Sequence, residues 1–496
     1  MSDISHPAHG ALARPRAGAS DLYRAVWRWH FYAGLFVLPF LVLLAVTGGI
    51  YLFRYDLDPL IHRGLMRVQA RATPPQTPQE LVAAALAARP GTVFRYIPPP
   101  SPVASAEVGV RGATGERTVV YVDPYDARVL GELPDKGTAM WVVRRLHSLA
   151  VAGPVARGLI EIAGGWSVLL VGTGLYLWWP RPRPGGERGG VVTVRGTPRR
   201  RVFWRDLHAV TGAVIGGVLV FLAVTGMPWS VFWGAYANQW ANGTNFGYPS
   251  GVRVSLPMSD VPLAAAGPTS WTLQGARLPR SAGAGYSAGA GDEHTGHAGP
   301  ADPASPRAEA PSGGTAPGGE TPRAIGLDAT VAAFDRLGLA PGYAVALPSG
   351  PTGVYTGSVY PNDLTRQRVV HLDQYSGEPL LDVGYAEYGP LGRALEWGIN
   401  IHMGQQWGLA NRLVLLAVCA ATVLLCASSA VMWWKRRPRG SLGVPPLPSD
   451  RRVLGGVVAI LAVGGVVLPL VGLSLLVVLA LDLALIRFGR RRPASA

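Results

Sequence analysis

The chain has 496 residues, of which 49% are hydrophobic and only 15% are charged. This composition excludes an ordinary soluble enzyme of that length and indicates a membrane protein with soluble parts. The formal net charge of +15 does not indicate nucleic-acid binding, because the arginines stand beside apolar segments and form no stripe within a soluble domain.

The first apolar segment, about residues 31–53, is long enough to cross a membrane. No small-residue cleavage pattern follows it, so we expect an uncleaved anchor. Four further apolar segments follow along the chain, at about 158–179, 208–233, 412–434 and 453–486.

The last of these segments is too long for one untilted crossing. It contains Gly464, Gly465, Pro469 and Gly472 near its centre, which predicts a tight hairpin of two short helices. A single, strongly tilted helix is the alternative. With the hairpin, the chain crosses the membrane six times.

Basic segments set the expected orientation. They lie before residue 30, at 181–205, around 435–452 and after 486. Because short cytoplasmic segments are enriched in Lys and Arg, we place all of them, and both termini, in the cytoplasm. The two large loops then face the periplasm or cell exterior.

These two loops repeat each other. The sequence "VVYVDPYDARVLGEL" from Val119 aligns without a gap with "VVHLDQYSGEPLLDV" from Val369, each a β-rich run broken by an Asp-x-Tyr turn. A helix-like segment precedes each, at 78–88 and 329–337, so each loop is expected to form a small α+β domain. The second loop also contains a Gly, Ala, Pro and Ser-rich insertion at 281–323, expected to be disordered, whose His294 and His297 are read as linker residues.

The apolar segments repeat as well. His30 and His208 each precede a Gly by four residues and a Thr-Gly pair by 17 and 18 residues. His147 and His402 each stand 31 residues before the first Trp of a pair, Trp178 or Trp433. The unit of span, outer domain and span therefore occurs twice in direct orientation.

The histidine positions sort by membrane face. His30 and His208 begin segments that leave the cytoplasm, and His147 and His402 precede segments that return to it. As one continuous helix, 31 residues would rise about 46 Å, close to the thickness of a bilayer with its headgroups, about 40–45 Å. We therefore expect two imidazoles near each face.

Two histidines per face point to haem. Taken alone, each is more simply an interfacial or capping residue; four at matched positions in duplicated helices require a shared reason. Two ligands do not complete a usual zinc site, whereas haem iron needs two axial ligands and an apolar slot. No CxxCH occurs, so the haems would be of b type. Small residues that could open the slot are Gly34, Gly172, Gly174 and Gly212.

Other candidates have plainer interpretations. His62 and Met403 lack counterparts in the other repeat, and His371 falls on a predicted strand. Cys419 and Cys426 lie seven apart on one apolar helix, too far for a disulfide. Five arginines are expected to contact either haem propionates, an anionic acceptor or lipid headgroups. They are Arg144, Arg145, Arg157, Arg393 and Arg412.

No nucleotide-binding fingerprint is present, and the cytoplasmic loops are too short for a flavin or NADPH domain. If haems near the two faces relay electrons across the membrane, the electron donor would be a membrane quinol or a separate cytoplasmic reductant.

The sequence resembles the PepSY-associated transmembrane proteins of bacteria, often described as iron-regulated membrane proteins. The resemblance rests on "WHFYAGLFVLPFLVLLAVTGGIYLF", "LHSLAVAGPVARGL", "LHAVTGAVIGGVLVFLAVTG" and "IHMGQQWGLANR", and it covers nearly all of residues 24–440. It implies PepSY-like outer domains and a di-haem inner-membrane reductase of ferric siderophores or other periplasmic ferric species. His30 and His208 would then hold the cytoplasmic-side haem, and His147 and His402 the outer haem.

Two other classes are weighed against this: a haem-free PepSY sensor or peptidase regulator, and a transporter of iron or siderophore. The expected fold is a membrane α-helical bundle of about six transmembrane helices, made of duplicated two-helix units and a C-terminal hairpin, with two extracytoplasmic α+β domains. The expected transmembrane helices are 30–53, 147–180, 207–233, 411–434 and the pair in 453–487; the outer domains are 54–146 and 234–410; and the cytoplasmic segments are 1–29, 181–206, 435–452 and 488–496.

Overall fold

The computed structural model describes residues 17–180, 191–243, 257–267, 269–281, 323–438, 443–445 and 451–489. The predicted insertion at 281–323, with His294 and His297, lies outside these residues apart from its two end positions. The chain divides into two compact units. The helical unit comprises Met1–Arg63, Lys136–Tyr248 and Gly389–Ala496, and the sheet unit comprises Gly64–Asp135 and Pro249–Tyr388.

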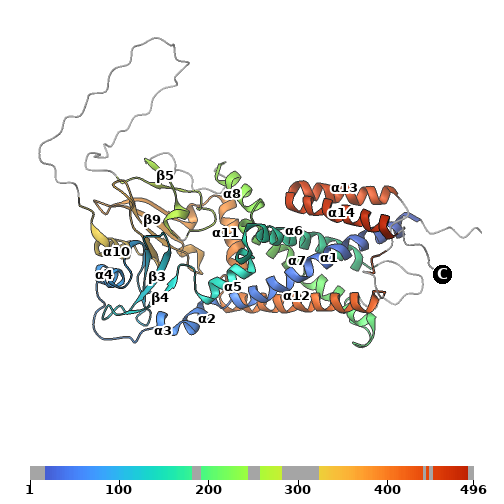
Figure 1. Cartoon of the computed structure of the whole chain (residues 1–496), viewed down its shortest axis with the longest axis horizontal. Coiled ribbons are helices and arrows are strands. Elements are labelled where there is room, and N and C mark those ends of the chain that lie inside the picture. Colours follow the sequence, from blue (N-terminus) through green and yellow to red (C-terminus); the bar gives the residue numbers. More distant parts are fainter. Residues whose placement is uncertain are drawn as a thin grey trace, which may run out of the picture. The chain divides into compact units, whose positions relative to one another are not determined.

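Four long apolar helices form the centre of the helical unit (Figure 1). Each packs against two of the others in the cyclic order α1, α6, α7, α12, so α1 lies diagonally opposite α7. All four are long and apolar enough to cross a membrane. They are α1 (Ala17–Tyr51), α6 (Gly153–Trp178), α7 (Arg201–Gly226) and α12 (Leu409–Arg436). The shorter helices of this unit are α2 (Arg54–Ile61), α5 (Ala139–His147), α8 (Trp233–Gly243), α11 (Pro390–His402), α13 (Arg451–Val467) and α14 (Pro469–Gly489).

The expected continuous helix from His147 to Trp178 is wrong. Helix α5 ends at His147, and α6 begins only at Gly153. Leu149, between the two helices, and Gly153, at the start of α6, have positive φ values of 52° and 88°, which a right-handed helix cannot continue through. The rise of α6 alone, 26 residues or about 39 Å, is enough to cross a bilayer.

The second repeat is interrupted at the corresponding place. Helix α11 ends at His402, and α12 begins at Leu409. Positive φ values at Gly404, Trp407 and Gly408 turn the chain between them. In both repeats the histidine therefore ends a short helix that is separate from the long one, and a regular spacing in the sequence concealed this turn.

The C-terminal segment forms two helices, α13 and α14, which pack against each other and against α1 and α6. Their close approach depends on glycine: a Cβ at Gly465 would lie 2.6 Å from the Cα of Gly472. Trp166 of α6 donates from Nε1 to Oγ of Ser474 in α14 at 2.9 Å. The apolar parts of the two helices, Val458–Val467 and Pro469–Leu481, are shorter than those of the four long helices, so the count of six crossings stays a prediction.

The sheet unit is built on one antiparallel sheet of eight strands in the order β10-β9-β8-β7-β1-β2-β3-β4. Its first half carries α4 and its second half α10, as the repeated sequence predicts. Thr77 and Glu80 form a capping box that fixes the start of α4. The first half comprises α3 (Arg63–Met66), α4 (Pro78–Ala88), β1 (Thr92–Ile97), β2 (Ala106–Arg111), β3 (Arg117–Val122) and β4 (Val129–Pro134). The second half comprises α10 (Gly326–Arg336), β7 (Ala344–Ala346), β8 (Val354–Val359), β9 (Arg368–Asp373) and β10 (Pro379–Gly384), with β5 (Met258–Pro262), β6 (Arg277–Pro279) and α9 (Leu263–Ala266) before it.

The two halves join edge to edge through β1 and β7, where Arg95 pairs with Ala346 and Tyr96 with Val345. A single apolar core runs beneath both halves and includes the fully buried Tyr96 and Phe334. The two loops, which the sequence assigns to separate α+β domains, thus contribute halves of one sheet and one core.

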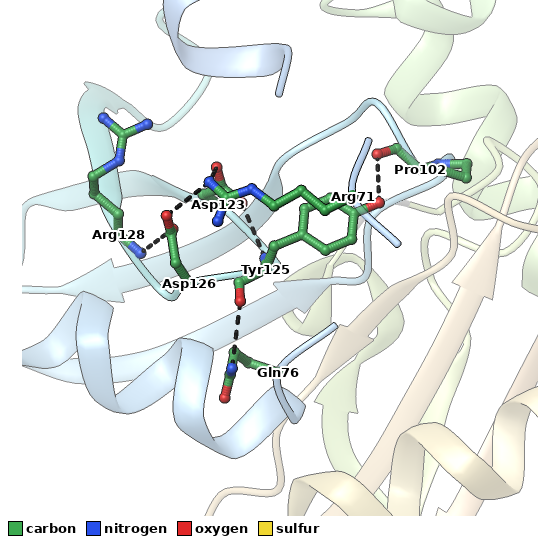
Figure 2. Close-up of polar contacts among 7 residues, drawn as sticks. All are labelled: Arg71, Gln76, Pro102, Asp123, Tyr125, Asp126 and Arg128. Carbon is green, nitrogen blue, oxygen red and sulfur yellow. Dashed lines mark hydrogen bonds and ion pairs between the residues drawn. The ribbon is translucent and has the colours of Figure 1, made fainter. Parts of the chain in front are cut away.

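The repeated Asp-x-Tyr motif closes the turn after the third strand of each half. In the first half the carboxylate of Asp123 accepts from the amide of Tyr125 at 2.9 Å (Figure 2), and in the second half Asp373 accepts from the amide two residues on at 2.8 Å. Arg71 lies across the first turn and donates to Asp126 at 2.8 Å. This hydrogen bond lowers the pKa of the Asp126 carboxyl. The motif is therefore accounted for by turn formation.

Candidate functional site

Two imidazoles from diagonally opposite helices approach each other inside the bundle. The ring centroids of His30 in α1 and His208 in α7 lie 6.4 Å apart, with their planes at 85°. Two imidazole nitrogens on one transition metal, each about 2 Å from it, lie about 4 Å apart, which puts the ring centres about 6 Å apart. The observed separation therefore suits two ligands on the opposite sides of one metal ion.

Three of the four predicted histidines have a threonine hydroxyl at Nδ1. The distance from Nδ1 to Oγ1 is 2.9 Å in each case. The threonine always comes from the other long helix of the same repeat, so the two pairs in the first repeat are reciprocal between α1 and the α5–α6 segment. The pairs are His30 with Thr173, His147 with Thr47, and His402 with Thr225.

These threonines fix the tautomer of their histidines. The hydroxyl of Thr47 donates its only proton to the carbonyl of Leu43, four residues back in its own helix. Thr173 and Thr225 donate to backbone carbonyls in the same way, at 2.7 Å. Because each hydroxyl proton is already used, the oxygen must accept a hydrogen bond from Nδ1–H of the imidazole. The lone pair of the ring is then on Nε2, which is the form that binds a metal.

His208 reaches the same state with a different partner. Its Nδ1 lies 3.2 Å from the carbonyl oxygen of Leu425 and 3.5 Å from Oγ of Ser428. Since a carbonyl can only accept, Nδ1 of His208 carries the proton. Ser428 occupies the position of Thr173 in the second repeat, 255 residues later, the same offset that relates His147 to His402.

A glycine follows each of the three threonines and makes room for the imidazole. A Cβ at Gly48, Gly174 or Gly226 would lie 3.3, 3.2 or 3.5 Å from Cε1 of His147, His30 or His402, respectively. Of the glycines expected to open a slot, only Gly174 contacts a histidine. Gly34 and Gly212 face leucines, and nothing lies within 4 Å of a Cβ built at Gly172.

The second pair of histidines, His147 and His402, lies at the other end of the bundle. Each ends a short helix, and the two are within electrostatic range of each other. Trp229 packs edge-on against His402, with 6.4 Å between the ring centroids. Along α1, His30 and the Thr47 that holds His147 are 17 residues apart, a rise of about 25 Å. The two pairs are thus separated by most of the hydrocarbon thickness of a bilayer, about 30 Å.

All four imidazoles keep part of their surface uncovered by the rest of the chain. Among the described residues, no group of three or more His, Cys, Asp or Glu side chains gathers in a form that could enclose a metal ion. Sites with two imidazoles, fixed tautomers and partly open rings fit a metal that brings its own equatorial ligands, as haem iron does.

The other sequence candidates have local roles or none of this kind. Nε2 of His62 accepts from the backbone amide of Ala139 at 3.0 Å, so its lone pair caps α5. Met403 is the C-cap residue of α11. His371 is buried in β9 beside Thr356 of β8, and its burial lowers its pKa to about 4. The two cysteines, Cys419 and Cys426, are free.

Three of the five arginines named as candidates in the sequence are engaged with protein groups. Arg412 forms an ion pair with Asp56 at 2.7 Å, and Arg157 donates to the carbonyl of Trp229 at 3.1 Å. Arg144 stacks on Trp141, with Cζ 4.6 Å from the ring centroid. The sequence interpretation overlooked Arg54, which is buried and donates to the carbonyl of Met403, next to His402.

In a comparison with known families, the model of the PepSY-associated TM region matches residues 27–436. The match includes all of α6, α7 and α12, most of α1 and the histidines described above, but not α13 and α14. No curated protein matches the chain.

Proposed function

This chain belongs to the family of the PepSY-associated TM region, and from that premise we propose that it is a transmembrane di-haem reductase of b type. In this proposal it passes electrons outward across the inner membrane of a bacterium to a ferric acceptor, a siderophore complex or another metal complex. His30 and His208 would hold one haem, and His147 and His402 the other.

The observation that carries the proposal is the pair His30 and His208, contributed by opposite helices with 6.4 Å between ring centroids. An interfacial or capping histidine needs no second imidazole opposite it. Bound haem would supply reversible one-electron exchange at iron.

The residues of the chain hold these imidazoles ready as ligands. Hydroxyls of Thr47, Thr173 and Thr225 accept from Nδ1–H and leave Nε2 as the metal-binding nitrogen. The glycine after each threonine leaves space beside the ring. Ligand orientation is therefore set by the helices, and little reorganisation is needed on binding.

The position of the two pairs supports transfer across a membrane. They lie about 25 Å apart along α1, so one pair is near each end of the spanning segment. By the positive-inside rule, the Arg-rich segments at 181–206 and 435–452 support a cytoplasmic location for the His30 end. The sheet unit would then be exposed in the periplasm. The electron donor would be a quinol or a cytoplasmic reductant, because the chain has no nucleotide-binding motif.

A visible spectrum of the purified full-length protein tests the proposal. We expect a b-type Soret band and an α band that sharpens with dithionite, with two haems per chain by pyridine haemochrome assay. The reduced protein is then mixed with ferric siderophores, ferric citrate or cupric salts in a stopped-flow instrument, and its reoxidation identifies the acceptor. A folded protein that remains colourless after expression with excess haem would contradict the proposal and favour a sensor or regulator.

A further inference from the structure

Arg54 is a buried cation at the His147 end of the helical unit. It is the first residue of α2, three residues after the end of α1, and only 7% of its surface is exposed. Its Cζ lies 4.9 Å from the ring centroid of Tyr51 and 4.4 Å from that of Tyr55. The guanidinium is therefore covered by two aromatic rings and cannot reach bulk water as a surface arginine does.

The charge of Arg54 is not neutralised by the part of the chain that the structure describes. Nη1 donates to the carbonyls of Met403 at 3.0 Å and Tyr51 at 3.3 Å. Nη2 is buried without a hydrogen-bond partner, and no described carboxylate pairs with the side chain. Burying a cation that no carboxylate neutralises is costly, and an anion bound at Nη2 would offset this cost.

Both contacts of Nη1 place Arg54 beside the second pair of histidines. Met403 is the residue directly after His402, and Tyr51 lies one helical turn after Thr47, the hydroxyl partner of His147. The guanidinium thus donates to the backbone of α1, whose Thr47 orients His147, and to the C-cap residue of α11, the helix that ends at His402.

Neighbouring cations do not share this property. Arg412 forms an ion pair with Asp56. Arg157, which occupies the position of Arg412 in the first repeat, donates to the carbonyl of Trp229. The position equivalent to Arg54 in the second repeat, 178 residues on, is Phe232. A cation at this place is therefore a feature of one repeat only and is not required by the packing of the duplicated helices.

We propose that Arg54 binds a carboxylate next to His147 and His402. The inference rests on the proposed function for the location of the ligand. The carboxylate could come from a propionate of the haem held by these histidines or from a diffusible carboxylate complex such as ferric citrate. A planar guanidinium with a free Nη2 donor suits either source.

The test compares Arg54→Gln with the matched control Arg412→Gln, which removes the same charge from the same end of the unit. Haem transfer to apomyoglobin measures haem affinity, and the His147 end is identified by the haem that His147→Ala lacks. Calorimetric titration with citrate measures binding of a free carboxylate. Arg54→Lys, which keeps the charge but not the planar donors, is measured alongside and replaces Arg54→Gln if that variant does not assemble.

If the source is a propionate, Arg54→Gln weakens the haem at the His147 end by about tenfold or more, and reconstitution with haem dimethyl ester removes the difference from wild type. If the source is diffusible, haem affinity is unchanged and citrate binding is lost in Arg54→Gln but kept in Arg412→Gln. Equal behaviour of Arg54→Gln and Arg412→Gln in both assays overturns the inference. A preparation without haem contradicts the proposed function instead, and the citrate titration then decides the inference by itself.

Discussion

The helical unit and the sheet unit each contain histidines beside threonine hydroxyls, yet the two arrangements differ in what they leave available. In the helical unit Thr47, Thr173 and Thr225 donate to their own helix, so the imidazole must be the donor. Thr356 lies on a strand, where no carbonyl four residues back is in reach, so its hydroxyl can donate to Nδ1 of His371. Among the described residues, no second imidazole is paired with His371. Contact with a hydroxyl is therefore not sufficient evidence of a metal ligand. The stronger evidence is a hydroxyl that already donates its proton to a backbone carbonyl, together with a second imidazole opposite the first.

The largest effect separates the two kinds of histidine directly. On the proposed function, His402→Ala should abolish one of the two haems and leave the other, because that haem would lose one of its two histidine ligands. His208→Ala should abolish the other haem. His371→Ala should leave both. Pyridine haemochrome assays and reduced-minus-oxidised spectra measure these outcomes, and loss of haem in His371→Ala would remove the distinction between the units.

The second effect is a pH dependence of the stability of the sheet unit. Burial lowers the pKa of His371 to about 4, below the unfolded value of about 6.5. The unfolded state therefore binds a proton first, and the sheet unit loses about 3 kcal/mol of stability as pH falls from 7 to 4. Hydrogen exchange of the β8 and β9 amides, corrected for intrinsic rates, measures this loss. In His371→Gln the loss over the same range should be smaller by that amount; an unchanged pH dependence would show that His371 is not its cause.

The third effect sharpens the role of the hydroxyl. Thr47→Val keeps the shape of the side chain but leaves Nδ1–H of His147 without an acceptor, so haem affinity at that end should fall about ten- to a hundredfold. Thr422→Val is the matched control, because the buried Thr422 donates to Val418 in its own helix and touches no imidazole. Apomyoglobin competition measures both variants, and equal affinities would exclude an orienting role for Thr47.

The smallest effect concerns the exception. Ser428→Ala removes a hydroxyl that is 3.5 Å from His208, while the Leu425 carbonyl at 3.2 Å remains as acceptor. Haem affinity of the His30 and His208 pair should change by about threefold or less. A loss as large as that in Thr47→Val would make Ser428, and not the carbonyl, the partner of His208.

Local patterns in the sequence predicted local structure well. The helix expected at 78–88 is α4, and the helix expected at 329–337 overlaps α10 (Gly326–Arg336). Both Asp-x-Tyr turns follow the expected strands. The pairing of β1 with β7 was not predictable, because the residue pattern within each strand does not indicate which distant strand will pair with its edge. The turn after His147 was concealed by a spacing that matched a continuous helix, although Gly153 and Pro154 mark a helix start.

The candidate site was predicted in part. Repetition singled out the four histidines, and it also showed the Thr-Gly pairs, which were left without a role because the sequence does not tell which helix faces which. Arg54 could not be found in this way, since it has no repeat partner. Arg54 stands out because its side chain is buried and its Nη2 donor has no hydrogen-bond partner, and both are properties of the folded chain.

The junction of β1 with β7 has a consequence for biosynthesis. Residue 95 must wait for residue 346, which the ribosome adds roughly 12 to 50 s later at about 5–20 residues per second. During that interval the nascent first half exposes a bare strand edge, to which another chain could add. A chaperone that shields this edge would be most needed while α6 and α7, which lie between residues 95 and 346, are being synthesised.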